Sequence, residues 1–136
     1  MPYKRVWEIG SFKVESPNER SLQILFSPQI DKGIKDTTVL MSTIVPHTGT
    51  TGAHTHDVDE IIYILTGRGL GVEGRETYDL EPGTVIYAPA GVEHECRNLG
   101  DDSMQLFCVF IPALPDEAVE RITKNAKVRV RRVRQD

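Results

Sequence analysis

The sequence has few cysteines and no long hydrophobic run. Its 136 residues include two cysteines, Cys96 and Cys108, which cannot build a disulfide framework and are consistent with a reducing compartment. We expect both to be small buried residues rather than reactive thiols. No apolar stretch reaches the length of a membrane span, and the first residues lack the apolar region of a signal peptide. These absences predict a cytoplasmic protein that has no membrane partner.

Basic residues are also scarce over most of the chain. Residues 1–120 carry 9 basic and 19 acidic side chains, and the whole chain has a formal net charge of -4. This balance argues against nucleic acid as a general partner. The final segment, 127–136, differs because arginine alternates there with valine. We interpret this basic tail as a charged edge strand or a subunit contact, with an anion-binding arm as the alternative.

The pattern along the chain is that of a single all-β domain over residues 1–136. Short apolar or alternating runs are separated by turn residues at intervals of about eight to twelve residues, which is typical of a barrel or sandwich. Strands are expected at 21–26, 37–45, 60–65, 70–72, 76–80, 84–88 and 104–111. The barrel core is expected to span about 37–112.

One helix is predicted at the C-terminal side, over residues 115–126. Pro115 suits a first helical position, and the acidic residues that follow favour the positive end of a helix. An apolar stripe continues the pattern through Ala118, Val119, Ile122 and Ala126.

The glycines at 69–74 have the spacing of a dinucleotide-binding fingerprint. That fingerprint functions only where a strand leads into a helix. Here the glycines lie inside a predicted hairpin that turns at Glu73-Gly74, and no helix follows. We therefore expect them to serve turns and close strand packing.

Only four histidines are present, yet two of them lie two residues apart. Side chains at i and i+2 of a strand project from one face, whereas on a helix they point about 200° apart. His54 and His56 therefore form a strand-type ligand pair, and Glu60 has the same parity beyond a turn-prone stretch. Imidazoles with one carboxylate suit Fe, Mn, Co, Ni or Zn rather than Ca or Mg. Two histidines that occur in a loop by chance are the alternative interpretation of this segment alone.

A second compact motif lies at 83–98. The pattern H-x-H, three residues, E, six residues, G is given by His54, His56, Glu60 and Gly67. The pattern G, five residues, P-x-G, two residues, H, three residues, N is given by Gly83, Pro89, Gly91, His94 and Asn98. With these two patterns the sequence resembles the cupin superfamily. One departure is a glycine that the family usually places six residues before the first histidine, where this chain has Thr48 followed by Gly49.

The resemblance implies a fold and a ligand set. It implies a cupin-type double-stranded β-barrel, or jelly roll, with a metal near its centre. It also implies that His54, His56, Glu60 and His94 are the ligands of one divalent transition metal, with Fe, Mn, Ni, Co and Zn left open.

Two classes of chemistry fit such a site, which would leave two neighbouring metal positions open. The expected function is a metal-dependent enzyme that acts on a small oxygen-bearing molecule, such as a carbonyl compound, carboxylate or sugar-like compound. The chemistry is either of the dioxygenase type or Lewis-acid isomerase or lyase chemistry, which needs a base. Tyr87 and His47 are the candidate catalytic residues for proton transfer, although a packing or surface role is the alternative for each. A non-catalytic small-molecule-binding or sensor protein is the alternative function.

Parity along the strand at 60–65 predicts both a pocket wall and an interface. Ile62 and Ile64 share the parity of Glu60 and are expected to line the pocket, together with one face of 104–111. Cys96 shares the parity of His94 and is a further candidate to point there. The outward residues of the same strand are also apolar, which is typical of a strand buried on both faces. Small members of the family that the sequence resembles commonly dimerise through such a sheet, so the resemblance implies a homodimer, formed through a surface that contains Ile61, Tyr63 and Leu65.

Overall fold

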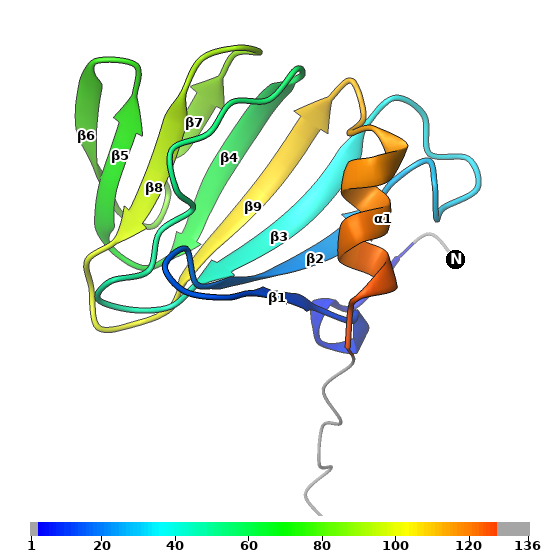
Figure 1. Ribbon diagram of the computed structural model, residues 1–136, viewed down its shortest axis with the longest axis horizontal. Helices are drawn as coiled ribbons and strands as arrows, with labels where there is room; N and C mark the ends of the chain where they lie inside the picture. The colour runs from blue at the N-terminus through cyan, green and yellow to red at the C-terminus, as the bar shows by residue number, and fades with distance from the viewer. Residues whose placement is uncertain (1–2, 128–136) are drawn as a thin grey trace, which may run out of the picture.

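The computed structural model describes residues 3–127, which form two antiparallel sheets and one α-helix (Figure 1). The larger sheet has the strand order β1-β2-β3-β9-β4-β7, and the smaller sheet has the order β6-β5-β8. The larger sheet comprises β1 (Phe12–Val14), β2 (Arg20–Phe26), β3 (Thr38–Ile44), β9 (Met104–Ile111), β4 (Asp59–Thr66) and β7 (Val85–Ala88). The smaller sheet comprises β6 (Glu76–Leu80), β5 (Gly69–Glu73) and β8 (His94–Asn98). The all-β jelly-roll fold is thus confirmed.

The centre of the larger sheet is β9, which pairs with β3 on one side and β4 on the other. Every second residue of β9 is buried, as expected for a strand with one face toward the core. Register places Ile62 opposite Cys108 and Ile64 opposite Leu106. The inner faces of these strands therefore form one continuous apolar surface.

The smaller sheet is extended by the chain between β3 and β4. Thr50 pairs with Arg97 and His54 pairs with His94 in isolated antiparallel bridges. The segment that carries the first histidine motif therefore lies alongside β8, which begins at the histidine of the second motif. The topology alone brings the two motifs together.

The helix α1 (Asp116–Lys124) is slightly shorter than predicted. Pro115 has an extended backbone, with φ -66° and ψ 159°, and is the N-cap rather than the first helical residue. At the other end, Asn125 is the C-cap, and two residues later Lys127 pairs with Ser11. The chain leaves the helix in order to join this bridge.

The structure contains elements that the sequence did not predict, and it describes only the beginning of the basic tail at the C-terminal end of the chain. A short 3-10 helix, η1 (Val6–Glu8), and the strands β1 and β8 were not predicted from the sequence. Of the predicted basic tail, only Lys127 belongs to the described residues, and the remainder, 128–136, lies outside them. Within residues 3–127, no helix has the length and apolar character that crossing a membrane requires.

The glycines at 69–74 occupy the hairpin β5–β6, as predicted. Gly74 lies in the turn with φ 57°, a conformation that glycine adopts easily. Gly69 has a different role, because a Cβ atom there would lie 1.8 Å from the carbonyl oxygen of Arg97 on β8. Glycine at this position allows β5 and β8 to approach closely.

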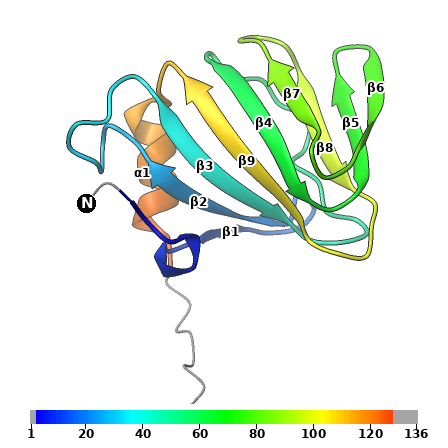
Figure 2. The same ribbon diagram turned by 180° about the vertical axis from the view of Figure 1, so that it is seen from behind.

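The helix lies on the inner side of the larger sheet, beside β2, in both views (Figures 1 and 2). Val119 and Ile122 are its buried residues and join the core cluster. The Gln29 side chain, in the loop between β2 and β3, donates hydrogen bonds to the carbonyl oxygen of Leu114 and to the carboxylate of Asp116. The beginning of the helix is thereby fixed to the sheet.

Candidate metal centre

The two histidine motifs are joined through their backbones. The amide of His54 donates to the carbonyl of His94 at 3.1 Å, and the amide of His94 donates to the carbonyl of His54 at 2.9 Å. The amide of Gly91 also donates to the carbonyl of His56 at 2.8 Å. These bonds hold three imidazoles on neighbouring segments, with the rings of His54 and His94 only 4.4 Å apart between centroids.

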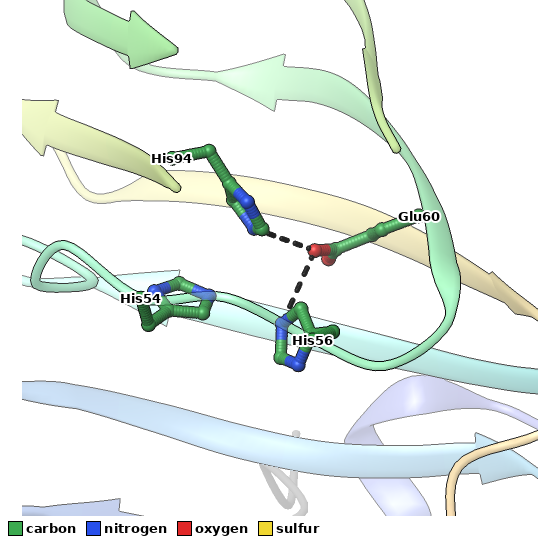
Figure 3. A group of neighbouring side chains, drawn as sticks. All are labelled: His54, His56, Glu60 and His94. Atoms are coloured by element: carbon green, nitrogen blue, oxygen red, sulfur yellow. Dashed lines mark hydrogen bonds and ion pairs between the residues drawn. The ribbon is translucent and has the colours of Figure 1, made fainter. Parts of the chain in front are cut away.

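Glu60, from β4, completes the group, and Figure 3 shows the four side chains directed toward one another. Its Oε1 atom lies 3.0 Å from Nε2 of His94 and 3.4 Å from Nε2 of His56. One ligand atom from each of His54, His56, Glu60 and His94 lies within 4.8 Å of the others. We call these four residues the His₃Glu cluster.

Backbone carbonyls orient two of the imidazoles. Nδ1 of His54 lies 2.7 Å from the carbonyl oxygen of Gly52, and Nδ1 of His94 lies 3.1 Å from that of Val92. A carbonyl oxygen only accepts, so each Nδ1 carries the proton and each Nε2 faces the cluster. Such a bond to the remote ring nitrogen is typical of metal-ligating histidines.

The protonation of the cluster reflects the proximity of its members. Burial raises the pKa of Glu60, but hydrogen bonds from His56 and His94 and their charges outweigh it and hold the pKa at about 2. Burial lowers the pKa of His54, and the neighbouring imidazoles lower it further. Burial also opposes protonation of His94, yet its hydrogen bond to Glu60 raises its pKa overall. The cluster therefore holds an ionised carboxylate beside an imidazole that binds a proton more readily than usual, and a metal cation would compete with that proton.

The cluster opens into a cavity of about 360 Å³ between the sheets and the helix. All four cluster residues line it, together with inward residues of β2, β3, β4 and β9. The predicted wall from β9 is confirmed by Leu106, Cys108 and Phe110. Cys96 and Cys108 are both buried and free, and burial raises the pKa of the Cys96 thiol to about 12. The two thiols are therefore neutral wall residues.

Comparison with known proteins decides the family. A family model described as a cupin domain matches residues 40–110, which run from within β3 to within β9 and include the whole His₃Glu cluster. The protein belongs to the cupin family. This confirms the resemblance that the two sequence motifs carry.

The sequence relatives of this cupin include an uncharacterized protein and a named enzyme. An uncharacterized protein of Methanocaldococcus jannaschii is 35% identical over 97 residues, or 71% of this chain and 76% of the relative. An L-ectoine synthase of Aliivibrio fischeri is 38% identical over 56 residues, or 40% of this chain and 44% of that enzyme.

Solved structures share the fold at lower identity. A predicted oxalate decarboxylase from Thermotoga maritima has a TM-score of 0.70 and 22% identity, with 79% of this chain and 96% of that chain covered. The polyketide cyclase RemF from Streptomyces resistomycificus has a TM-score of 0.68 and 22% identity, with 82% and 79% covered. At these identities the likeness shows the fold alone.

The donor set of this cupin fits a transition-metal ion. Three imidazoles and one carboxylate suit Fe, Mn, Co, Ni or Zn, whereas Ca and Mg require mainly oxygen ligands. The cluster lies at a cavity, so a bound ion would be accessible to a small molecule. The family and the cluster together therefore indicate a metal ion whose identity is open.

The two residues considered for proton transfer lie outside the cavity of this cupin. Register places Tyr87 opposite Ile61 on the outer face, where it is 56% exposed. Its hydrogen bond to Asp59 raises the pKa of its phenol. The His47 side chain is exposed in a turn with φ 69°, and its Nδ1 lies 3.6 Å from a carboxylate oxygen of Asp101. Neither side chain is among the residues that line the cavity.

The inward strand residues mostly follow the predicted parity. Ile62 lines the cavity, as expected, whereas Ile64 is fully buried in the core and does not reach it. Glu95 has the opposite parity from His94, and its carboxylate binds Thr50 at 2.6 Å and Arg97 at 3.0 Å instead.

Several polar wall residues of this cupin were missed by sequence reasoning. Arg20 lines the cavity from β2 and Asn18 from the turn before it. Ser42 lines it from β3 and Arg121 from α1. The alternation of Arg20 with Leu22 was a signal that an arginine faces inward. For Arg121 the sequence carried no such signal, because its position depends on how the helix packs.

Proposed function

We propose that this protein is a metal-dependent enzyme that acts on a small oxygen-bearing organic molecule. The observation that carries the proposal is the His₃Glu cluster, whose ligand atoms converge at the edge of a cavity. A metal of this kind supplies Lewis acidity or, if it is redox-active, activation of dioxygen. The volume of about 360 Å³ suits a small substrate.

The residues of the chain itself would hold a small substrate, keep the imidazoles in place and exclude water from the cavity. Leu40, Ile62, Leu106 and Phe110 provide apolar walls beside the cluster. These side chains exclude water and so strengthen the electrostatic interactions of a bound substrate with the cluster. The carbonyls that accept from Nδ1 of His54 and His94 keep both rings in place.

The composition of the cavity wall favours one class of chemistry. Among the described residues that line it, there is no lysine, no tyrosine and no carboxylate other than Glu60. Isomerase or lyase chemistry needs a base within hydrogen-bond reach of the substrate. We therefore favour dioxygenase-type chemistry, in which the metal provides the reactivity.

A local likeness supports an enzyme over a binding or sensor protein. Over 56 residues the chain is 38% identical to a protein named L-ectoine synthase, which is an enzyme name. The substrate of that relative is not carried over to this chain.

The test is elemental analysis of protein purified without added metal, followed by oxygen-uptake assays with small carbonyl compounds and carboxylates. We expect about one transition-metal ion per chain, in line with a single four-ligand cluster. Iron together with oxygen uptake would support the favoured class, whereas Zn, Ni or Mn with anaerobic turnover would support the Lewis-acid class. A metal-filled protein that binds a metabolite without turnover would support the sensor alternative. A protein that contains no metal and takes none up would contradict the proposal.

We further propose that the protein is a homodimer that uses the outer face of β7, β4 and β9. Ile61, Tyr63 and Leu65 are 38–40% exposed on this face in the single chain. Register places Tyr87 opposite Ile61 and Val85 opposite Tyr63, and both partners are exposed too. A continuous exposed apolar face of this kind is typical of an interaction surface.

Sedimentation at low micromolar concentration tests the dimer. The wild-type protein should sediment as a dimer, and Tyr63→Glu should sediment as a monomer because a charge in the apolar face opposes burial. Ile30→Glu is the matched control, since Ile30 is an exposed apolar residue in a loop away from this face. A monomeric wild-type protein, or a dimeric Tyr63→Glu variant, would rule out this interface.

A further inference from the structure

Two arginines face the cavity from opposite elements. Arg20 begins β2 on the same face as Leu22, and both line the cavity. Arg121 comes from α1, where Ala118 and Ile122, at helical spacing, line the same cavity. The helix α1 lies beside β2 on the inner side of the sheet (Figures 1 and 2), and both arginines line the one cavity.

Neither arginine is paired with a carboxylate in an ion pair within residues 3–127. Nη1 of Arg20 donates to the carbonyl oxygen of Asn18 at 3.0 Å, which uses one of the five N–H donors of the guanidinium. Burial lowers the pKa of Arg20, and the charge of Arg121 lowers it further. The two cations therefore repel one another, and an anion between them would remove this cost.

A buried hydroxyl without a partner lies near the same arginines. Ser42 is 4% exposed and lines the cavity, and its Oγ atom has no hydrogen-bond partner in the described part of the chain. Leu22 pairs with Ser42 and Arg20 pairs with Ile44, so Ser42 and Arg20 are diagonal neighbours on one face. Buried polar groups normally have a partner, and an oxygen of a ligand would supply it.

We propose that Arg20, Arg121 and Ser42 form a subsite for the carboxylate of an organic acid, whose other end faces the His₃Glu cluster. This inference rests on the proposed function and names its substrate class. Arg20, Ser42 and Arg121 line the same cavity of about 360 Å³ as all four residues of the His₃Glu cluster. A small acid therefore fits between the arginines and the cluster.

A carboxylate suits this subsite better than a phosphate. The fork of a guanidinium matches the two oxygens of a carboxylate, and the unpartnered Ser42 hydroxyl can donate to one of them. The helix end that would favour a phosphate, at Asp116 and Glu117, carries acidic side chains. The remaining wall near Leu40 and Ile62 is apolar and suits a short carbon chain.

Calorimetric titration of the full, metal-loaded protein with glutarate tests the subsite. Glutaramide is the neutral counterpart, and inorganic phosphate is the competing anion. Glutarate should bind at least about tenfold more tightly than either, and Arg20→Met or Arg121→Met should each weaken it about tenfold. Arg20→Lys should retain part of the affinity because it keeps the charge.

Lys124→Met is the matched control, since Lys124 is on the same helix but does not line the cavity. It should bind glutarate as the wild-type protein does. Ligand-free Arg121→Met should unfold at a temperature at least as high as the wild-type protein, because it removes a repulsion. If Arg20→Met does not fold, Arg121→Met, on an exposed helix position, decides the outcome.

The result separates the subsite from the metal. If both arginine variants keep the wild-type metal content and the wild-type affinity for glutarate, the subsite is overturned and the proposed function stays in place. Arginine-dependent glutarate binding in a protein that takes up no metal would leave the subsite in place and overturn the proposed function. Equal affinity for glutarate and glutaramide, or no binding of glutarate, would also overturn the subsite.

Discussion

His94→Ala should yield a folded protein whose metal affinity is at least about 100-fold lower than that of the wild type. The substitution removes one of three imidazoles from the His₃Glu cluster, and with it the Nε2 atom that lies 3.0 Å from Glu60. The backbone bonds between residues 54 and 94 do not depend on the side chain, so the segment should keep its place. Elemental analysis after desalting, together with circular dichroism, measures both effects.

The matched control for this variant is His47→Ala. His47 is the one histidine outside the cluster, and its side chain is exposed in a turn. Its removal should leave the metal content unchanged. Full metal content in His94→Ala would show that His94 is not a ligand, and metal loss in His47→Ala would show that the effect is not specific to the cluster.

Gly69→Ala should lower the free energy of unfolding by about 3 kcal/mol or more, through overpacking against the backbone of β8. A Cβ atom at this position would lie 1.8 Å from the carbonyl oxygen of Arg97, and a backbone atom cannot move aside as a flexible side chain can. The strands β5 and β8 must separate, and this displaces β8, which carries His94 and Cys96. Urea denaturation followed by circular dichroism measures the loss, and the metal affinity should fall with it.

Gly74→Ala provides the comparison within the same hairpin. Gly74 has φ 57°, and a Cβ atom there would meet nothing within 4 Å. Its substitution should cost only about 1–2 kcal/mol, the cost of a left-handed conformation. Equal losses for the two variants would mean that the close approach of β5 to β8 is not what requires glycine.

The fold and the cluster were predictable because they depend on local patterns. The apolar run at 104–111 and the two spaced motifs each specify a strand or a turn without reference to distant residues. The pairing of His54 with His94 then follows from the topology of the barrel. Side-chain parity was sufficient to place Glu60 and Ile62 on the inner face.

The candidate proton-transfer residues were chosen by nearness in sequence, which was a poor guide to nearness in space. Tyr87 precedes Pro89 by two residues, but register places Ala88 opposite Glu60 and so turns Tyr87 outward. His47 lies close before the first motif, yet its turn conformation leaves it beside Asp101. Contacts of this kind depend on the register of distant strands, which a single sequence does not specify.

The helix α1 is held at both of its ends. Gln29 binds its beginning, and two hydrogen bonds between Ser11 and Lys127 hold the chain just after its end. A helix held in this way acts as a fixed wall and not as a hinged lid. Ala53 and Thr55 of the histidine segment and Arg121 of the helix line the cavity and are exposed to solvent, so all three lie at its mouth. A small molecule that enters the cavity would therefore pass between a fixed helix and the segment that carries His54 and His56.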